Sequence, residues 1–267
     1  MSEQPRTKLE VQGVSKHFTL PTGEPVIAVS DISFDVHENE FCVLLGPSGC
    51  GKSTVLRLIA GLEEPSSGSL MLEGNDILGT DHERGMVFQS YTSFDWLTVQ
   101  QNVEYGMKLN GVSRAERQDR ADHFIDLVKL SRFRHAYPKQ LSGGMKQRVA
   151  IARTLANQPS LILMDEPFGA LDAETRWSMQ ELMISIMDST RTTVVMVTHD
   201  IEEALFLGDH IIFLSAHPGT VLEDDRPTFK TGQRIVQKED ALSLDGYAEA
   251  KRHIMRLMRA QSHHHLA

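Results

Sequence analysis

The sequence predicts an α/β fold with a mostly parallel sheet, an N-terminal antiparallel β part and an inserted helical subdomain. Short apolar runs that suit buried strands occur at 41–45, 161–164, 193–198 and 211–215. Helical patterns separate these runs, and a charged helical stretch covers about 98–130. Buried strands that alternate with helices are typical of an α/β fold with a parallel sheet.

The antiparallel part is predicted at the N-terminus. Residues 9–18 and 26–36 alternate apolar and polar side chains, and Pro21-Thr22-Gly23 separates them. This pattern indicates a β-hairpin. Two further short strands are expected at 69–73 and 85–89, the first after a turn at 65–68.

A glycine-rich segment follows the strand at 41–45 and precedes a helix that includes Val55. It is Gly46-Pro47-Ser48-Gly49-Cys50-Gly51-Lys52-Ser53-Thr54, which fits G-x-x-x-x-G-K-[ST]. Such a turn lets backbone N–H groups close around phosphate oxygens at the positive end of the helix. Lys52 is expected to reach the β- and γ-phosphates, and Ser53 to place its hydroxyl on Mg²⁺. The segment predicts a P-loop NTPase core that binds a nucleoside triphosphate.

Composition narrows the class of protein. The net charge of −9 argues against nucleic acid as the main partner, because phosphate backbones require a basic surface. The two cysteines, Cys42 and Cys50, are expected to be reduced thiols. Residues 1–5 lack the apolar core of a signal peptide, and no stretch approaches the ~20 apolar residues of a membrane span. We therefore expect a cytosolic chain.

Polar residues follow three of the predicted strands. Asp165 and Glu166 come after the strand at 161–164, where an acidic pair faces the ligand crevice of an α/β sheet. Asp165 is expected to hold Mg²⁺ through water, and Glu166 to orient or deprotonate the attacking water. His199 and Gln89 also stand at strand ends, and His199 suits contact with a γ-phosphate. Taken singly, an acidic turn, a structural histidine and a solvated glutamine are equally ordinary explanations.

A second anion site is predicted in Leu141-Ser142-Gly143-Gly144-Met145-Lys146-Gln147-Arg148. Ser142 is expected to cap a helix, and Gly143 and Gly144 leave its first N–H groups accessible. A serine-capped helix alone explains the serine but not the paired glycines. Two such anion sites far apart in the sequence suggest a shared nucleotide site.

The ordered set of motifs resembles the ATP-binding subunit of ABC transporters over roughly residues 9 to 222. The resemblance implies that Gln89 is the Q-loop glutamine at the catalytic and metal site, and that His199 is the switch histidine. It further implies that Phe18 stacks on adenine and that residues 142–146 are the signature, with a D-loop at 169–172. Two subunits of this family pack head to tail, so that each ATP lies between one subunit's phosphate loop and the other's signature.

Closer features resemble the nitrate, sulfonate and taurine branch of bacterial importers. They are Glu83 to Gln89, Trp96-Leu97-Thr98, Met164 to Ala173 and Thr198 to Ala204. The resemblance implies a homodimeric ATPase motor on the cytoplasmic face of the membrane. That motor drives uptake of a small solute through a separate permease, which a solute-binding protein supplies. Two departures stand out: Met145 replaces the wider family's glutamine, as is usual in this branch, and Asp95 stands where the branch often has proline.

The expected organisation has three parts. Residues 1–90 and 155–222 form the ATP-binding core, 91–154 a helical signature subdomain, and 223–267 a tail with a helix at 245–261 that packs on the body. His263-His264-His265 is expected to be a solvated end.

Two other functions compete with the importer hypothesis. The first is a soluble non-transport ABC ATPase of translation, repair or cluster assembly, which the single compact cassette without long coiled coils disfavours. The second is a nucleotide sensor without turnover, which the Asp165-Glu166 pair and His199 disfavour.

Overall fold

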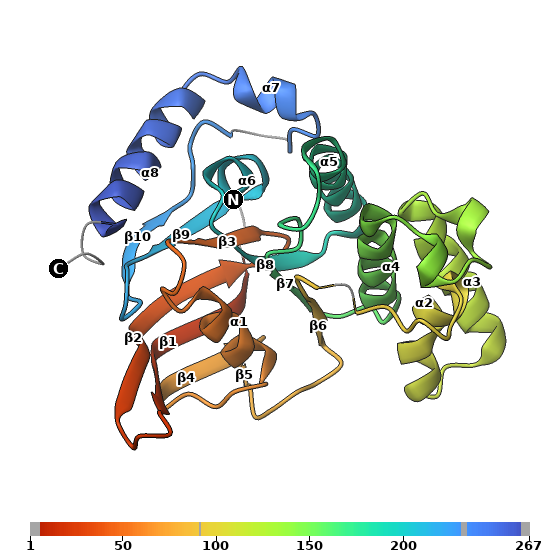
Figure 1. Cartoon of the computed structure of the whole chain (residues 1–267), viewed down its shortest axis with the longest axis horizontal. Helices are drawn as coiled ribbons and strands as arrows, with labels where there is room; N and C mark the ends of the chain where they lie inside the picture. The colour runs from red at the N-terminus through yellow and green to blue at the C-terminus, as the bar shows by residue number, and fades with distance from the viewer. Residues whose placement is uncertain (1–5, 91, 231–233, 263–267) are drawn as a thin grey trace.

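A computed structural model describes residues 6–90, 92–230 and 234–262, so the expectations for residues 1–5 and 263–265 lie outside the described residues. The chain forms two sheets that pack around helix α1, and a helical lobe extends to one side (Figure 1). One sheet is antiparallel and the other is mostly parallel. The predicted fold class is confirmed.

The larger sheet carries the order β10-β9-β3-β8-β7-β6. The five strands from β9 to β6 are parallel, and β10 is antiparallel at the edge. Every residue of β3, β8 and β9 is buried, as expected for strands covered on both faces. The strands are β3 (Phe41–Leu45), β6 (Arg84–Val87), β7 (Leu161–Asp165), β8 (Thr193–Thr198), β9 (His210–Leu214) and β10 (Val221–Asp225).

The smaller sheet has the order β2-β1-β4-β5. The predicted hairpin is present, with Phe18 paired to Val26 near its tip. Apolar residues of this sheet, of α1 and of one face of the parallel sheet form one continuous core. The elements are β1 (Thr7–Thr19), β2 (Pro25–His37), β4 (Ser67–Leu72), β5 (Asn75–Asp76) and α1 (Lys52–Ala60).

The helical lobe contains α2 (Val99–Leu109), α3 (Arg114–Leu127) and α4 (Gly143–Ala156), with short 3₁₀ turns at Ser131–Phe133 and Pro138–Gln140. The predicted helical stretch at 98–130 is two helices, because Gly111 adopts a left-handed φ of 74° between them. Thr98 begins α2 with a capping box to Gln101.

Helices α5 and α6 pack against the other face of the parallel sheet, and α7 and α8 arch over them (Figure 1). They span α5 (Ala173–Thr190), α6 (Ile201–Leu207), α7 (Lys238–Leu242) and α8 (Tyr247–Ser262). Across the described ranges, no helix is both long and apolar enough to cross a membrane.

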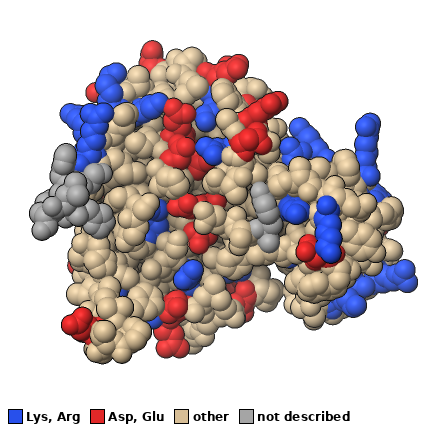
Figure 2. All heavy atoms as spheres, in the orientation of Figure 1, with Lys and Arg blue, Asp and Glu red and all other residues tan. Residues whose placement is uncertain are grey.

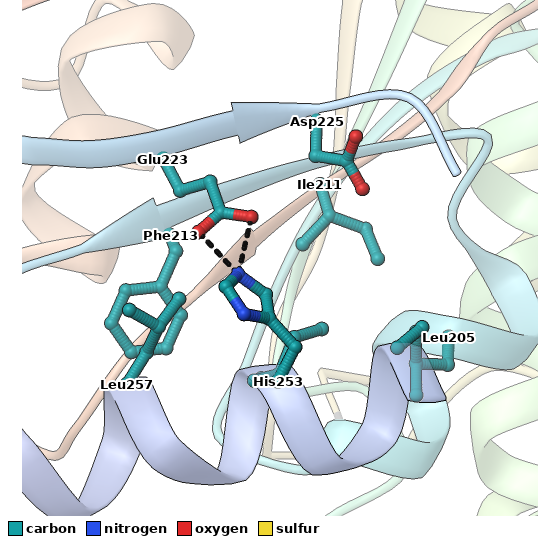
Figure 3. A pocket seen from close by; sticks show the side chains of 9 residues that line it. Leu205, Ile211, Phe213, Glu223, Asp225, His253 and Leu257 are labelled. Carbon is teal, nitrogen blue, oxygen red and sulfur yellow. Dashed lines mark hydrogen bonds and ion pairs between the residues drawn. The ribbon is translucent and has the colours of Figure 1, made fainter. Parts of the chain in front are cut away.

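Helix α8 confirms the helix expected in the tail, and it packs on the body. Its Ile254 is buried in the core, and His253 Nε2 lies 2.7 and 2.9 Å from the two carboxylate oxygens of Glu223 on β10 (Figure 3). The same small cavity holds Asp225, whose pKa is raised by burial and by the neighbouring Glu223.

Basic side chains gather on the outer side of α8. Arg252, Arg256 and Arg259 line one hollow there. Figure 2 shows Lys and Arg over this end of the molecule, while Asp and Glu form a band nearer the middle of the same face. The negative net charge is therefore unevenly distributed over the surface.

Three local predictions were wrong. The sequence predicts no strand beyond 211–215, yet β10 forms at Val221–Asp225, because its backbone pairs with β9 at the sheet edge, where Glu223 is half-buried and Asp224 and Asp225 are exposed. Strand β4 begins inside the predicted turn, since Ser67 pairs with Ser15 of β1. Strand β6 ends at Val87, so Gln89 lies in the loop beyond it.

A buried charge cluster under β10 predicts acid sensitivity. Burial alone would raise the pKa of Glu40, but the imidazole of His210, 3.6 Å away, and hydrogen bonds from Arg226 and the His37 N–H lower it from 4.5 to about 2. A depressed carboxylate pKa stabilises the fold above pH 4.5, and this contribution is lost as the pH falls towards 2. Glu40→Gln should cost at least about 3 kcal/mol of unfolding free energy near pH 6. In urea unfolding, the difference in unfolding free energy between the wild type and Glu40→Gln should shrink to about 1 kcal/mol near pH 2.5. A difference that does not change with pH would contradict the lowered pKa of Glu40.

Candidate active site

The predicted phosphate loop joins β3 to α1. Gly51 precedes the helix with φ 91° and Gly49 has φ 80°, both in the left-handed region that glycine tolerates. Lys52 is buried, and its Nζ donates to the carbonyl oxygens of Gly46 and Pro47, each at 2.8 Å. The loop therefore curls around the lysine ammonium, which brings the positive charge to the place where anionic oxygens would enter.

Ser53 of α1 and Asp165 of β7 are in hydrogen-bond contact. The Ser53 hydroxyl, on the first turn of α1, donates to Asp165 Oδ1 at the end of β7, at 2.9 Å. A hydroxyl and a carboxylate are hard oxygen ligands of the kind that Mg²⁺ takes together with substrate phosphates. The pair fits the predicted metal site.

Glu166 follows β7 and contacts residues that follow the strands on both sides of it, β8 and β6. Its Oε1 is 3.0 Å from His199 Nδ1 after β8, and its Oε2 accepts a long bond of 3.5 Å from Gln89 Nε2 beyond β6. Glu166 has φ 42°, an unfavourable conformation for a non-glycine residue, and its N–H donates to Val197 O. A carboxylate held beside an imidazole at a strained backbone position is an arrangement suited to general-base chemistry.

The signature residues lie on a different surface. Ser142 begins α4, and its hydroxyl accepts from the Met145 N–H at 3.4 Å, as predicted for a cap. Gly144 packs against Thr175 of α5, where a β-carbon would come within 2.4 Å of a methyl group. The hollow beside Ser142 is also lined by Lys129, Phe133, Arg148 and Glu174. All of the loop 46–54 is described, and none of its residues lines this hollow.

Phe18 belongs to the antiparallel sheet near the hairpin tip. Its ring is partly exposed, and Lys16 Nζ lies 5.0 Å from the ring centroid. An exposed ring with a cation at its face is open to stacking by a flat ligand.

The phosphate loop is supported from behind by a turn that the sequence did not predict. The turn between β9 and β10 packs there: Gly219 donates to Ala28 O at 3.1 Å, and a β-carbon on Gly219 would lie 2.1 Å from Cys50 O. Only the glycine in His217-Pro218-Gly219 could have signalled this close approach. Cys50 is itself buried and unbridged, and burial raises the pKa of its thiol despite the nearby Lys52.

Two glycines of the loop give a matched test. A β-carbon on Gly51 would meet Val29 Cγ1 at 2.4 Å and Ala28 O at 2.8 Å, whereas one on Gly49 meets nothing within 4 Å. Both substitutions cost roughly 1–2 kcal/mol for a left-handed residue, but only Gly51→Ala also displaces the loop. In calorimetric ATP titrations, Gly51→Ala should abolish binding and Gly49→Ala should weaken it modestly. Equal affinities for the two variants would contradict the packing argument.

Comparison with known proteins identifies relatives for this arrangement. The sequence profile described as "ABC transporter" matches residues 29–169. The nitrate import ATP-binding protein NrtD of Synechocystis sp. is 49% identical over 213 residues, which are 80% of each chain. The taurine import ATP-binding protein TauB of Roseobacter denitrificans is 45% identical over 223 residues, which are 84% of this chain and 83% of that one.

A solved structure is similar as well. It is a dimeric structure of a post-hydrolysis state of an ATP-binding cassette bound to ADP and Pi. Its TM-score is 0.70 at 34% identity, and the match covers 82% of this chain and 98% of that chain.

Proposed function

This chain belongs to the ABC transporter family, and from that premise we propose that it is the ATP-hydrolysing motor subunit of an importer for small solutes of the nitrate, sulfonate and taurine class. The similarity to NrtD and TauB favours this function over a soluble non-transport ATPase. The observation that carries the catalytic part is the convergence of Glu166, His199 and the Ser53–Asp165 pair beside the loop.

Each residue of this cluster has a proposed role. Lys52 and the N–H groups of loop 46–54 bind the phosphates, while Ser53, Asp165 and Gln89 hold Mg²⁺, which shields phosphate charge when bound. Glu166 deprotonates or orients the water that attacks the γ-phosphorus. His199 fixes the Glu166 carboxylate and contacts the γ-phosphate. Support comes from the 2.9 and 3.0 Å contacts within the two pairs.

A second copy of the chain would complete the site. We propose that Ser142, Gly143 and Gly144 of one protomer bind the phosphates of the ATP held by its partner's loop, and that Phe18 stacks on the adenine. The dimeric state of the similar ADP-bound cassette and the position of the signature on its own hollow support this. The helix dipole of α4 then stabilises ATP only when two copies close.

The permease is expected to dock near the loop that follows β6. Trp96 is 72% exposed there, although its ring contacts the Phe94 ring at a tilt of 43°, with centroids 5.3 Å apart. Arg153 of α4 donates to the Thr92 carbonyl and hydroxyl at 2.7 and 2.6 Å, so the loop is bonded to the signature helix. This contact supports mechanical coupling between the permease and the ATP site. We propose a peripheral location at the cytoplasmic face, with a solute-binding protein acting through the permease.

The same division of labour leads us to propose three parts. Residues 1–90 and 155–222 bind ATP, 91–154 carry the signature and the permease contact, and 223–267 form a C-terminal segment.

An affinity purification from gently solubilised membranes tests the importer proposal. The Glu166→Gln protein should retain a polytopic permease at near-equal amounts, identified by mass spectrometry. Adding Trp96→Ala should reduce that recovery severalfold, because the exposed indole is removed while the ATP site is untouched. Recovery with ribosomes or other soluble partners alone would favour the non-transport class instead.

A further inference from the structure

A buried polar chain runs from the C-terminal segment to the loop that holds His199. It begins at Lys238, the first residue of α7, passes through Gln180 of α5 and ends at Glu203 of α6. The three residues are 8%, 0% and 4% exposed. Lys238 Nζ donates to Gln180 Oε1 at 3.3 Å, and Gln180 Nε2 donates to Glu203 Oε1 at 3.1 Å.

Glu203 fastens the residue before His199. The Thr198 hydroxyl donates to Glu203 Oε2 at 2.7 Å, and the same hydroxyl oxygen accepts from the Asp200 N–H at 3.1 Å. Asp200 in turn caps α6 by accepting from the N–H groups of Glu202 and Glu203. Both neighbours of His199 are thus bound to the first turn of α6, which fixes the backbone from which the half-exposed imidazole reaches Glu166.

These three residues also form a buried charge pair, in which the amide of Gln180 lies between the ammonium of Lys238 and the carboxylate of Glu203. Burial raises the pKa of Glu203, although hydrogen bonds from Thr198 and Gln180 oppose this. Lys238 Nζ lies 5.2 Å from the Trp177 ring centroid and 6.0 Å from the Phe206 ring centroid, and it is 3.8 Å from Glu202 Oε2. Buried polar groups in such a network are costly unless every member is satisfied, so the members hold one another in place.

We propose that Lys238, Gln180 and Glu203 form a positioning chain through which the C-terminal segment sets the orientation of His199 and thereby the rate of ATP hydrolysis. None of the three touches the loop or the Glu166 carboxylate in the described contacts, so they act through His199. The inference rests on the proposed role of His199 in turnover.

The test measures kcat and KM for ATP hydrolysis by the purified protein. Lys238→Met keeps an unbranched side chain of similar length but removes the ammonium, and it should lower kcat by about tenfold while KM stays within about a factor of two. Lys238→Arg keeps the cation and should restore most of kcat. Lys251→Met is the matched control. Lys251 also pairs with Glu202, at 2.6 Å, but it is not a member of the positioning chain formed by Lys238, Gln180 and Glu203. Its kcat should equal that of the wild type.

A second comparison separates positioning from general weakening. In a His199→Ala background, Lys238→Met should cause no further loss of kcat, because the two changes share one route. An equal further loss would overturn the positioning role. Glu203→Gln provides a second entry to the chain if Lys238→Met does not fold, and a wild-type kcat in that variant would overturn the inference.

The outcomes separate the positioning chain from the role of His199 itself. If His199→Ala lowers turnover and Lys238→Met does not, only the positioning chain is wrong. If His199→Ala turns over like the wild type, the proposed catalytic role of His199 is wrong and the chain has nothing to position.

Discussion

Replacing Glu166 by glutamine should stop ATP hydrolysis while leaving ATP binding intact. The introduced amide would keep the size of the side chain and could still bond His199, but it cannot accept the proton of the attacking water. General-base catalysis is worth roughly 10²–10⁴ in rate, so phosphate release should fall at least about a hundredfold. Because ATP would persist, the variant should accumulate as an ATP-bound dimer.

Light scattering coupled to size-exclusion chromatography detects that dimer. With ATP and Mg²⁺, Glu166→Gln should elute at twice the 29.9 kDa monomer mass, and with ADP it should not. Asp188→Asn, a change on the far end of α5, is the control and should hydrolyse ATP normally. Normal turnover by Glu166→Gln would remove Glu166 from the base role.

Replacing Lys52 by alanine should remove most nucleotide affinity. The buried ammonium is held at the centre of the loop by the Gly46 and Pro47 carbonyl oxygens, where no other cation is described in contact with them. A charged hydrogen bond to a phosphate is worth about 1.5–3 kcal/mol, and the loop also loses its internal donor. Binding of a fluorescent ATP analogue should weaken by about a hundredfold.

The exposed Lys139 of the helical lobe gives a charge-matched control, and Lys139→Ala should bind the analogue like the wild type. Unchanged affinity in Lys52→Ala would refute the assigned contact. The thermal unfolding of Lys52→Ala without nucleotide should also be measured. If only the loop is disturbed, the core around Val55 and Leu56 stays folded and the unfolding transition remains.

The parts of the site that follow from local sequence could be predicted. The loop at 46–54, the acidic pair at the end of β7 and His199 after β8 each stand where a buried apolar strand ends. Parallel strands end at one edge, so the pattern predicts that these residues come together, and the structure places the Ser53–Asp165 and Glu166–His199 pairs 2.9 and 3.0 Å apart. Ser142 as a helix cap likewise depends only on its neighbours.

Other features depend on residues far apart in the sequence and carry no local signal. Strand β10 forms because Asp225 pairs with Ile211, and β4 is lengthened by pairing with β1. The support of the loop by Gly219 and the chain from Lys238 to Glu203 join separate elements, and single polar residues in amphipathic helices look solvated in a sequence. Tertiary contacts decide such features, and a hydrophobic pattern does not record them.

The central claim is that hydrolysis at Glu166 drives solute uptake. The most direct measurement reconstitutes this chain with its co-purified permease and binding protein in liposomes and follows radiolabelled taurine and nitrate. We expect ATP-dependent accumulation of one of these solutes with the wild-type chain and none with Glu166→Gln, at equal ATP binding. Accumulation that continues with Glu166→Gln, or ATP hydrolysis by the wild-type complex without movement of either solute, would contradict the claim.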